Sequence, residues 1–421
     1  MNTRKEFFNS LALAFLYGVI FYAVIFVMFQ RGILRQVPDS DTFAALWDGG
    51  WYRSVVERGY EYSDSTASNS AFFMLFPMVW KLTHLSGYGI AFLNIVFFAI
   101  GFGIFCTVYS FTVVEKLVLI SVPSVYLCFV PYSESLSILF LSVAIWGMVK
   151  NKRYVIWIGL FFAALTRPPN TVLILAFLIA ELVCSDRRSV FSSVKNYFLN
   201  YGIPTIAGLL FFTWYQYNDT GVWFAFFKQE KQWGHEFKWP TFPFSSMNGL
   251  RILWLNGVAM FLGFISLLLL IKIGIKWLIK NKVYSDKILA VTFLFFTAML
   301  LKTVFFMPTW VTYSTNVFDI HRYVFISPFF WVFVHRYTKS GAYKPLDYLW
   351  VFLLSNAFWL LFHHYLHITY FVYFNFGTIF IMLYMLFANK KLSWPALVIF
   401  ALQVFLMLDM FQTFISPALP G

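Results

Sequence analysis

Asp48 is the strongest candidate for chemistry in this sequence, because it stands between aromatic residues in a chain that is poor in charge. It lies in the stretch ALWDGGWYRSVVERGY, residues 45–60. Partial burial beside aromatic rings suits a carboxylate to work as a general base. The plainer alternative is a surface aspartate that caps a short helix. Asp39 and Asp41 lie nearby in the sequence, and we expect them to be solvated loop acids.

The residues that flank this aspartate predict a short helix at a membrane surface. Trp47 and Tyr52 have rings with a polar edge, which prefer the boundary between lipid and water, and we expect them to contact a substrate. The spacing of Trp47, Trp51 and the valines that follow predicts a helix with one apolar side. Gly49 and Gly50 are expected to break this helix early, or to let a ligand approach the backbone.

Two arginines are candidates for binding an anionic group, such as a phosphate. Arg322 begins an apolar stretch directly after a polar segment, and a guanidinium binds phosphate through two hydrogen bonds. His321 precedes it and is expected to assist. The alternative for Arg322 is a side chain that extends to the membrane interface without a ligand.

Arg167 is the second candidate, because it interrupts an apolar stretch. An ionisable residue recessed in a membrane is a candidate for function. The alternative is a buried ion pair with Glu134, another charge inside an apolar stretch. The two descriptions are compatible if Glu134 orients Arg167 or an acceptor hydroxyl.

The segment KQEKQWGHEFKWP, residues 228–240, is expected to form a loop over the site. Trp233 could stack on a sugar face, although a packing role is equally compatible with its sequence. Gln232 and His235 are candidates for polar contacts with a substrate. No Walker A loop or dinucleotide fingerprint is present, which argues against a nucleotide-driven pump or a nucleotide-sugar site. We expect no cofactor and no divalent metal ion.

The composition indicates whether these residues belong to a soluble protein or to a membrane protein. Of 421 residues 60% are hydrophobic and 12% are charged, whereas about 25% are charged in a soluble domain. The chain is therefore predicted to be an integral membrane protein. Its net charge of +13 does not indicate a nucleic-acid partner, because the basic residues form short clusters between apolar runs, as cytoplasmic loops do. These clusters lie at 150–153, 187–188, 272–287, 336–344 and 390–391.

Long apolar runs predict most of the transmembrane helices. A helix needs about 20 apolar residues to cross a bilayer. Slightly short candidates lie at 201–217 and 322–336. The full-length candidates are residues 8–30, 88–112, 252–271, 288–306, 347–363, 370–388 and 394–413.

Two further apolar stretches are predicted to be hairpins. Residues 117–149 are interrupted by VPYSES, and residues 155–183 are interrupted by TRPPN. Hairpins keep the neighbouring basic clusters on one side of the membrane, as the positive-inside rule requires. Prolines in both interruptions would turn the chain. The arms of the second hairpin have about 12 residues, roughly 18 Å, so its tip should be recessed in a membrane core of about 30 Å.

Together these elements predict an all-α polytopic protein of about 11–13 transmembrane helices in one domain, residues 1–421. The N-terminus is expected in the cytoplasm, with the first apolar run an uncleaved span. The polar loops at about 31–87, 218–250 and 308–321 are expected to face the non-cytoplasmic side and to carry the candidate residues. Arg167 and Glu134 should line a cavity that opens to the same side.

Several of these stretches resemble sequence blocks of one enzyme family. WDGGWYRSVVERGY followed by AFFMLFPMVW resembles the Trp-Asp and Phe-Phe-Pro blocks of the PIG-V-like mannosyltransferases, which belong to the GT-C glycosyltransferases. PYSESLSILF resembles the family's Tyr-Ser-Glu block, and LTRPPNTVL its Arg-Ser-Asn-Gly block. KQEKQWGHEFKWP resembles the Gln-x-x-Trp-Gly block, and IHRYVFISPFF the late Arg-Tyr…Pro block. The blocks occur in the family's order and span about residues 47–330.

The resemblance implies a GT-C-type bundle and a specific reaction. A sugar, mannose in the family, would move from a polyprenyl-phosphate donor to a hydroxyl of a lipid-linked or surface glycan acceptor, with inversion at the anomeric carbon. Asp48 would be the base, and Arg322 and Arg167 would bind the donor phosphate. The site would face away from the cytoplasm, across the plasma membrane of a prokaryote or in the ER of a eukaryote. Pro168 and His235 depart from the family pattern, so the resemblance indicates the reaction type more firmly than the sugar or acceptor.

Two other classes of function remain open. A flippase or transporter of lipid-linked sugars would explain the spans and the recessed charges. Transporters usually contain internal repeats, however, and none is apparent here. A purely structural membrane subunit is the third possibility, and it predicts that no property depends on Asp48.

Overall fold

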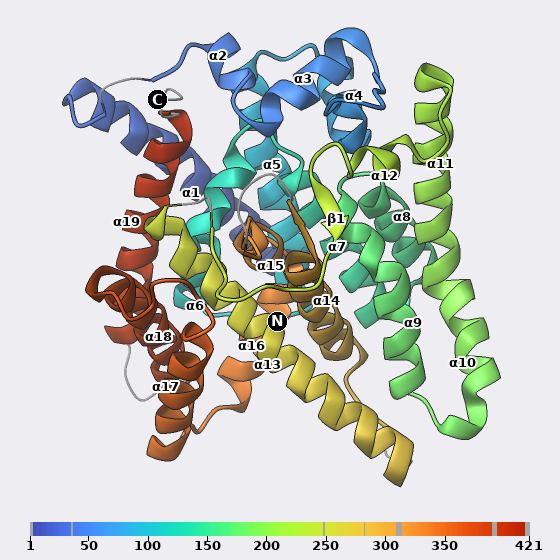
Figure 1. Ribbon diagram of the computed structural model, residues 1–421, viewed down its shortest axis with the longest axis vertical. Helices are drawn as coiled ribbons and strands as arrows, with labels where there is room; N and C mark the ends of the chain where they lie inside the picture. Colours follow the sequence, from blue (N-terminus) through green and yellow to red (C-terminus); the bar gives the residue numbers. More distant parts are fainter. Residues whose placement is uncertain are drawn as a thin grey trace. The chain divides into compact units, whose positions relative to one another are not determined.

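The computed structural model describes residues 3–34, 37–246, 249–281, 283–308, 314–389 and 394–416. The basic cluster at 390–391 and part of the predicted loop at 308–321 lie outside these residues. The chain is almost entirely helical (Figure 1). It divides into two compact units: unit 1 comprises Met1–Ile174, Phe198–Trp233 and Val404–Gly421, and unit 2 comprises Leu175–Tyr197 and Gly234–Gln403. The expectation of one domain stays a prediction.

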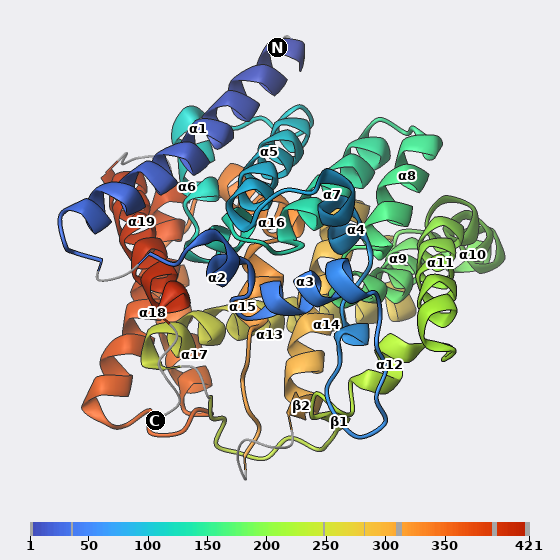
Figure 2. The same ribbon diagram turned by 90° about the horizontal axis from the view of Figure 1, so that it is seen from above.

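Unit 1 contains the N-terminal half of the helices and the residues predicted to form most of the site. In it α1 and α5 run side by side, and so do α7 and α8 (Figure 2). Its elements are α1 (Thr3–Gln30), α2 (Ser40–Ala44), α3 (Asp48–Arg58), η1 (Asn69–Ala71), α4 (Leu75–Thr83), α5 (Gly87–Cys106), α6 (Val113–Ile120), η2 (Pro123–Phe129), α7 (Glu134–Val149), α8 (Arg153–Ala164), η3 (Pro168–Val172), η5 (Phe198–Gly202), α11 (Ile203–Thr220), α12 (Ala225–Gln229) and the end of α19 (Trp394–Ile415).

Unit 2 is built around α13, which packs against both α14 and α18. An antiparallel pair of three-residue strands, which the sequence did not predict, joins His235 to Pro308 and Phe237 to Phe306. Its elements are α9 (Leu173–Val183), η4 (Arg187–Ser189), α10 (Val190–Tyr197), β1 (His235–Phe237), α13 (Leu250–Lys280), α14 (Lys287–Phe305), β2 (Phe306–Pro308), α15 (Ile320–Phe325), α16 (Pro328–Ser340), α17 (Pro345–Trp359), α18 (Ile368–Ala388) and the start of α19.

Six helices in the described residues are long and apolar enough to cross a membrane, and a bent pair makes a possible seventh. The chain is therefore an integral multi-pass membrane protein. The number is smaller than the predicted 11–13, because several apolar stretches form helices too short to cross alone. For example, α17 has 15 residues and α16 has 13, or about 20–23 Å against a core of about 30 Å. The six are α1, α5, α13 from Ile252, α14, α18 and α19.

Both predicted interruptions are present. η2 and α7 meet at an angle of 101° across the VPYSES stretch. α8 ends at Ala164 and η3 begins at Pro168, so the TRPPN stretch also breaks a helix. The helices on either side of that break, α8 and α9, have 12 and 11 residues, close to the predicted length. The depth of this break in a membrane stays a prediction.

A charged residue just before the first predicted hairpin is buried. Lys116 pairs with Glu6 of α1 at 2.5 Å, and about 10% or less of either side chain is exposed. The neighbouring Glu115 accepts from the backbone N–H of Thr112 at 2.6 Å and completes a capping box at the start of α6. The local sequence does not show that Lys116 is buried, because its partner carboxylate comes from α1, which packs against α6.

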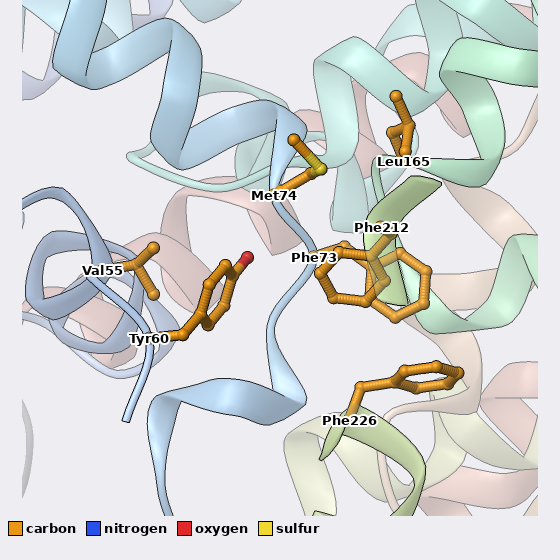
Figure 3. Close-up of a cluster of buried hydrophobic side chains, with 7 residues drawn as sticks. All are labelled: Val55, Tyr60, Phe73, Met74, Leu165, Phe212 and Phe226. Carbon is orange, nitrogen blue, oxygen red and sulfur yellow. The ribbon is translucent and has the colours of Figure 1, made fainter. Parts of the chain in front are cut away.

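Two hydrophobic clusters fix α3 against the rest of unit 1. Tyr52 of α3 belongs to a cluster with members from α2, α4, α5 and α7. Val55, one turn later on α3, belongs to a second cluster (Figure 3) that reaches the residue just before the TRPPN break. The second cluster consists of Val55, Tyr60, Phe73, Met74, Leu165, Phe212 and Phe226. These contacts hold α3 between the two interrupted stretches.

Candidate functional site

α3 begins at Asp48, and the residue before it has an unusual backbone conformation. Trp47 has φ 51° and ψ −124°, a region that residues other than glycine rarely occupy. Its indole N–H donates to the carbonyl of Phe414, in the last turn of α19, at 3.1 Å and makes no capping hydrogen bond to α3. Such backbone strain tends to occur at functional sites, where the surrounding structure holds it in place. Asp48 is half-buried and is the first helical residue, so the N-cap position of α3 belongs to Trp47.

Gly49 and Gly50 do not break the helix, contrary to one of the two expectations. Both lie in the first turn of α3, directly against the end of α2. A Cβ on Gly49 would lie 2.7 Å from the carbonyl oxygen of Ala44, and one on Gly50 would lie 2.8 Å from that of Ala45. The glycines are needed because two backbones approach each other here, and this close approach sets the position of Asp48.

The backbone of Asp48 is tied to the bend between η2 and α7. Its N–H donates to the Tyr132 hydroxyl at 3.2 Å. The bend is held in turn by Asn94 of α5, whose amide donates to the carbonyls of Val130 and Tyr132 at 2.6 and 2.8 Å. Asn94 is fully buried. The start of α3 and the start of α7 are therefore fixed to one another.

Glu134 and Arg167 form a buried ion pair, which was one of the alternatives for these residues. The two side chains are 0% and 7% exposed, and Arg167 Nη2 lies 3.0 Å from Glu134 Oε1. Asn170 supports the loop that carries Arg167, since its amide nitrogen lies 2.9 Å from the hydroxyls of Ser137 and Thr166 and from the Ala163 carbonyl. The pair thus joins the two interrupted stretches.

Tyr52 connects Asp48 to this ion pair. Its hydroxyl lies 2.7 Å from the Ser133 hydroxyl, next to Glu134 in the chain. Burial, followed by the negative charges of Glu134 and Asp48, raises the pKa of Tyr52, whereas the positive charge of Arg167 opposes that shift. Three consecutive residues, 132–134, thus join the backbone of Asp48, the hydroxyl of Tyr52 and the ion pair. The structure brings together four residues that the sequence had singled out separately.

Trp233 packs against α3, whereas the described contact of Gln232 is with the loop that follows α3. The expectation that residues 228–240 form a loop over the site stays a prediction. Trp233 meets the ring of Trp51 edge-to-face at 5.1 Å and that of Phe72 at 5.7 Å. Its indole N–H donates to the Ser68 carbonyl at 3.2 Å. Gln232 donates to the carbonyl of Asp64 at 2.5 Å. The packing role of Trp233 is therefore present in the structure, and the sugar-stacking role stays a prediction.

An apolar cavity of about 370 Å³ lies beside the start of α3. It is lined by residues of α1, α2 and the end of α19, with Phe43 and Phe411 among them. Tyr88 also lines it, and its ring stacks on Phe43 at 4.7 Å. Phe414, which accepts the hydrogen bond from Trp47, follows on the same helix as Phe411. A hydrocarbon chain is the kind of group that such a lining favours.

Arg322, His321 and His235 belong to unit 2. Both residues of the His321–Arg322 pair are buried in α15, and the nearest described carboxylate to Arg322 is that of Asp319 at 3.9 Å. Burial, followed by the charge of Arg322, lowers the pKa of His321 to about 3, so the ring is neutral at pH 7. His235 begins β1. A neutral imidazole beside Arg322 leaves the guanidinium as the cation of this pair.

Sequence reasoning did not single out the two buried asparagines. Asn94 holds the VPYSES bend, and Asn170 holds the TRPPN loop. The available signal for Asn94 was an amide in the otherwise apolar run of residues 88–106, because a polar residue in a span needs a partner. Asn170 was visible as part of TRPPN, but two of its three partners, Ser137 and Ala163, come from α7 and α8.

Within the described residues, no group of three or more histidine, cysteine, aspartate or glutamate side chains is arranged to hold a metal ion. Comparisons of the chain with protein-family models, with curated proteins and with solved structures found no match.

Proposed function

We propose that this chain is a membrane glycosyltransferase of the GT-C type, similar to the PIG-V-like mannosyltransferases. It would transfer a sugar, mannose by that likeness, from a polyprenyl-phosphate donor to a hydroxyl of a lipid-linked or surface glycan acceptor. The observation that carries this proposal is the gathering of Asp48, Tyr52, Glu134 and Arg167 in one part of unit 1. These residues lie far apart in the sequence and combine a carboxylate, a phenol and a buried cation.

Asp48 is the base in the proposed reaction. Its carboxylate takes the proton of the acceptor hydroxyl while the acceptor oxygen bonds to the anomeric carbon. The bond between that carbon and the donor's phosphate oxygen breaks, and its electron pair leaves with the lipid phosphate. Attack opposite to the leaving group inverts the anomeric configuration. A lipid phosphate is a good leaving group, so the protein needs cations near it more than a strong acid.

Two arginines supply positive charge in this proposal. Arg322 binds the donor phosphate, with the neutral His321 beside it as a possible hydrogen-bond partner. Arg167 is held by Glu134 at 3.0 Å and keeps a fixed positive charge near Tyr52. Glu134 in turn orients Arg167. Tyr52 and Trp47 border the acceptor position, and Gln232, Trp233 and His235 are the polar and aromatic contacts of the covering loop.

The membrane-embedded part of the structure supports a lipid-linked substrate. Six or seven helices have the length and composition of membrane spans. The apolar cavity of unit 1, lined by residues of α1, α2 and the end of α19, offers a place for the hydrocarbon of the donor. A donor whose tail stays in lipid requires a site at the edge of the membrane, and we place that site on the non-cytoplasmic side because the basic clusters favour the opposite side. No nucleic acid, cofactor or metal ion is part of the proposal.

A reconstituted assay tests the proposal against the flippase alternative. The purified full chain is placed in liposomes with radiolabelled polyprenyl-phosphate mannose and candidate glycolipid acceptors, and liposomes without protein serve as the control. We expect label to move into an acceptor through a new glycosidic bond of inverted configuration. Movement of intact donor between leaflets without a new bond would support a flippase and contradict the proposal.

A further inference from the structure

α13 is longer than a straight crossing of the bilayer requires. The helix runs unbroken from Leu250 to Lys280 (Figure 1) and contains 31 residues. At 1.5 Å per residue its length is about 46 Å, against a hydrocarbon core of about 30 Å. Roughly ten residues are therefore not needed to cross the core. All the lysines of the helix lie in its C-terminal part, residues 272–280.

These lysines form one row on the surface of α13. Lys272, Lys276 and Lys280 follow at intervals of four residues, so their side chains share one face of the helix. All three side chains are exposed. Within the described residues, none of the three ammonium groups has a hydrogen-bond or ion-pair partner. The row therefore presents positive charge that no side chain of the described structure balances.

A second row, beside the lysines, is apolar. Ile271, Ile275 and Ile279 each precede a lysine by one position and are 49%, 51% and 76% exposed. A continuous apolar row that reaches the last turn of a helix is unfavourable in water. Adjacent basic and apolar rows are typical of a helix segment at the boundary between lipid and water. Its apolar side lies in the membrane, and its lysines extend to the head groups.

The turn between α9 and η4 holds the end of α13 in place. The Trp277 indole N–H donates to the Ser185 carbonyl at 2.9 Å. Arg187 donates from Nη1 to the Leu278 carbonyl at 2.5 Å and from its backbone N–H to Asn281 Oδ1 at 3.2 Å. Because these bonds fix the last turn of α13, the lysine row has a defined orientation.

The acidic residues nearest in the sequence to this end of α13 are already engaged. Asp186 Oδ1 accepts from the backbone N–H of Arg188 at 2.8 Å and from the Asn281 amide at 3.3 Å. The other two are paired with cations: Glu181 with Lys287 at 2.6 Å, and Asp286 with Arg336 at 2.7 Å. A partner for the lysine row must therefore come from outside the described chain.

We propose that the last turns of α13 bind the anionic head groups of the surrounding bilayer through Lys272, Lys276 and Lys280. Basic residues that directly follow a membrane span attract acidic lipids, and each lysine near such a surface contributes about a fivefold factor. The isoleucine row favours a lipid surface over a soluble polyanion, which would leave these apolar side chains in water. This surface does not depend on the proposed sugar transfer.

A fluorescent label at position 279 tests where the end of α13 lies. Ile279→Cys is introduced into the full chain together with Cys184→Ser, and the remaining Cys106 and Cys128 are fully buried. The labelled chain is reconstituted in phosphatidylcholine liposomes that contain lipids with a nitroxide quencher on the acyl chain. We expect these lipids to quench the label more strongly than iodide added to the water. Stronger quenching by iodide would place the end of α13 in water and overturn the proposal.

The same label measures the preference for an anionic head group. The nitroxide is carried either by phosphatidylglycerol or by phosphatidylcholine, at matched mole fractions. We expect phosphatidylglycerol to reach half-maximal quenching at a mole fraction about fivefold lower or less, because it gathers at the lysine row. Equal quenching by the two lipids would overturn the choice of an anionic partner.

Removing the lysine row should abolish this preference. Lys272→Gln, Lys276→Gln and Lys280→Gln are combined in the labelled chain, and the preference for phosphatidylglycerol should fall about fivefold or more. All three positions are exposed, so the fold should be retained. An unchanged preference in this variant would exclude the row as the binding surface.

The matched control removes the same amount of charge from elements too short to cross a membrane. Lys81→Gln, Lys228→Gln and Lys231→Gln replace exposed lysines on α4, on α12 and just after α12. This variant should keep the full preference. An equal loss in both triple variants would show a general effect of net charge and overturn the site on α13.

Discussion

Arg167 in unit 1 and Arg322 in unit 2 are both nearly buried arginines, yet their surroundings differ. Arg167 lies 3.0 Å from a carboxylate that is fully buried. Arg322 lies 3.9 Å from the carboxylate of Asp319, whose side chain is 24% exposed. Glu134 and Arg167 come from separate helical segments, whereas Asp319 precedes Arg322 by one helical turn. The first arginine is part of a long-range framework, and the second has a local and looser partner.

This difference suggests separate tasks for the two arginines. A buried pair is costly to open, because each charge would lose an oppositely charged partner away from water. Arg167 is therefore suited to orienting its neighbours through a fixed charge. Separating Arg322 from Asp319 costs less, because that contact is longer and its carboxylate is partly solvated. Arg322 is therefore suited to binding an incoming phosphate.

The largest expected effect comes from removing the buried carboxylate. Glu134→Ala removes the carboxylate that lies 3.0 Å from the buried Arg167 and should lower the free energy of unfolding by about 3–5 kcal/mol. Asp319→Asn, the matched change beside Arg322, should lower it by no more than about 1 kcal/mol. The measurement is thermal unfolding of both variants in the same detergent. Equal losses would show that the two arginines are held alike.

A double variant separates the loss of a charge from the loss of packing. Replacing Glu134 by Leu and Arg167 by Met together should recover most of the stability, because buried ion pairs are often no more stable than apolar substitutes. The same double variant should fail in sugar transfer if Arg167 contributes a charge to the site.

The second effect concerns donor affinity. Arg322→Gln removes charged hydrogen bonds to the phosphate, each contributing about 1.5–3 kcal/mol, and should weaken donor binding by roughly tenfold to 150-fold. Glutamine retains hydrogen-bonding groups on a shorter, uncharged side chain, and thermal unfolding of the variant checks that the fold is preserved. Binding is measured with the radiolabelled donor and no acceptor. An unchanged dissociation constant would exclude Arg322 from the phosphate site.

The third effect concerns the backbone beneath Asp48. Gly49→Ala places a Cβ 2.7 Å from the Ala44 carbonyl oxygen and should destabilise the chain by about 1–3 kcal/mol through overpacking. Gly274→Ala is the matched control on α13, because nothing lies within 4 Å of its Cβ. That change should stabilise the chain by about 0.5–1 kcal/mol. Thermal unfolding in detergent distinguishes the two directions.

The smallest effect is a pH dependence that belongs to unit 2. Burial lowers the pKa of His321 to about 3, whereas an unfolded histidine titrates near 6.5. Below about pH 6.5 His321 binds a proton in the unfolded chain but stays neutral in the folded chain. The free energy of unfolding therefore decreases as the pH falls toward 3. The slope is at most about 1.4 kcal/mol per pH unit. His321→Gln should reduce the loss between pH 7.5 and 5.5, and His363→Gln, at an exposed position, should not.

The sequence predicted those parts of the site that depend on local pattern. The apolar side of residues 47–56 predicted a helix, and α3 spans Asp48–Arg58. The polar interruptions predicted both breaks, and the charges at 134 and 167 suggested their pairing. The parts that sequence reasoning missed depend on distant neighbours. Lys116 is buried because α1 supplies Glu6 as its partner. The strands that contain His235 and Phe306 are defined by their pairing with each other.

The number of spans was overestimated for a related reason. An apolar stretch of 17 residues, such as 347–363, satisfies a hydropathy count whether or not its helix is continuous. In the structure α17 ends at Trp359, and the chain turns before Ile368 begins the next helix. Helix ends depend on caps and tertiary contacts, so hydropathy alone could not place them.

The rate of sugar transfer by Asp48→Asn tests the proposed chemistry most directly. Asp41→Asn is the matched control, because Asp41 is 87% exposed and lies seven residues earlier in the same segment. Both variants are assayed in one turnover at saturating donor, with donor affinity measured in parallel. We predict a rate about 100-fold to 10,000-fold below the unmodified chain for Asp48→Asn, with unchanged donor affinity, and a normal rate for Asp41→Asn. Transfer by Asp48→Asn at the rate of the unmodified chain would contradict the assignment of Asp48 as the base.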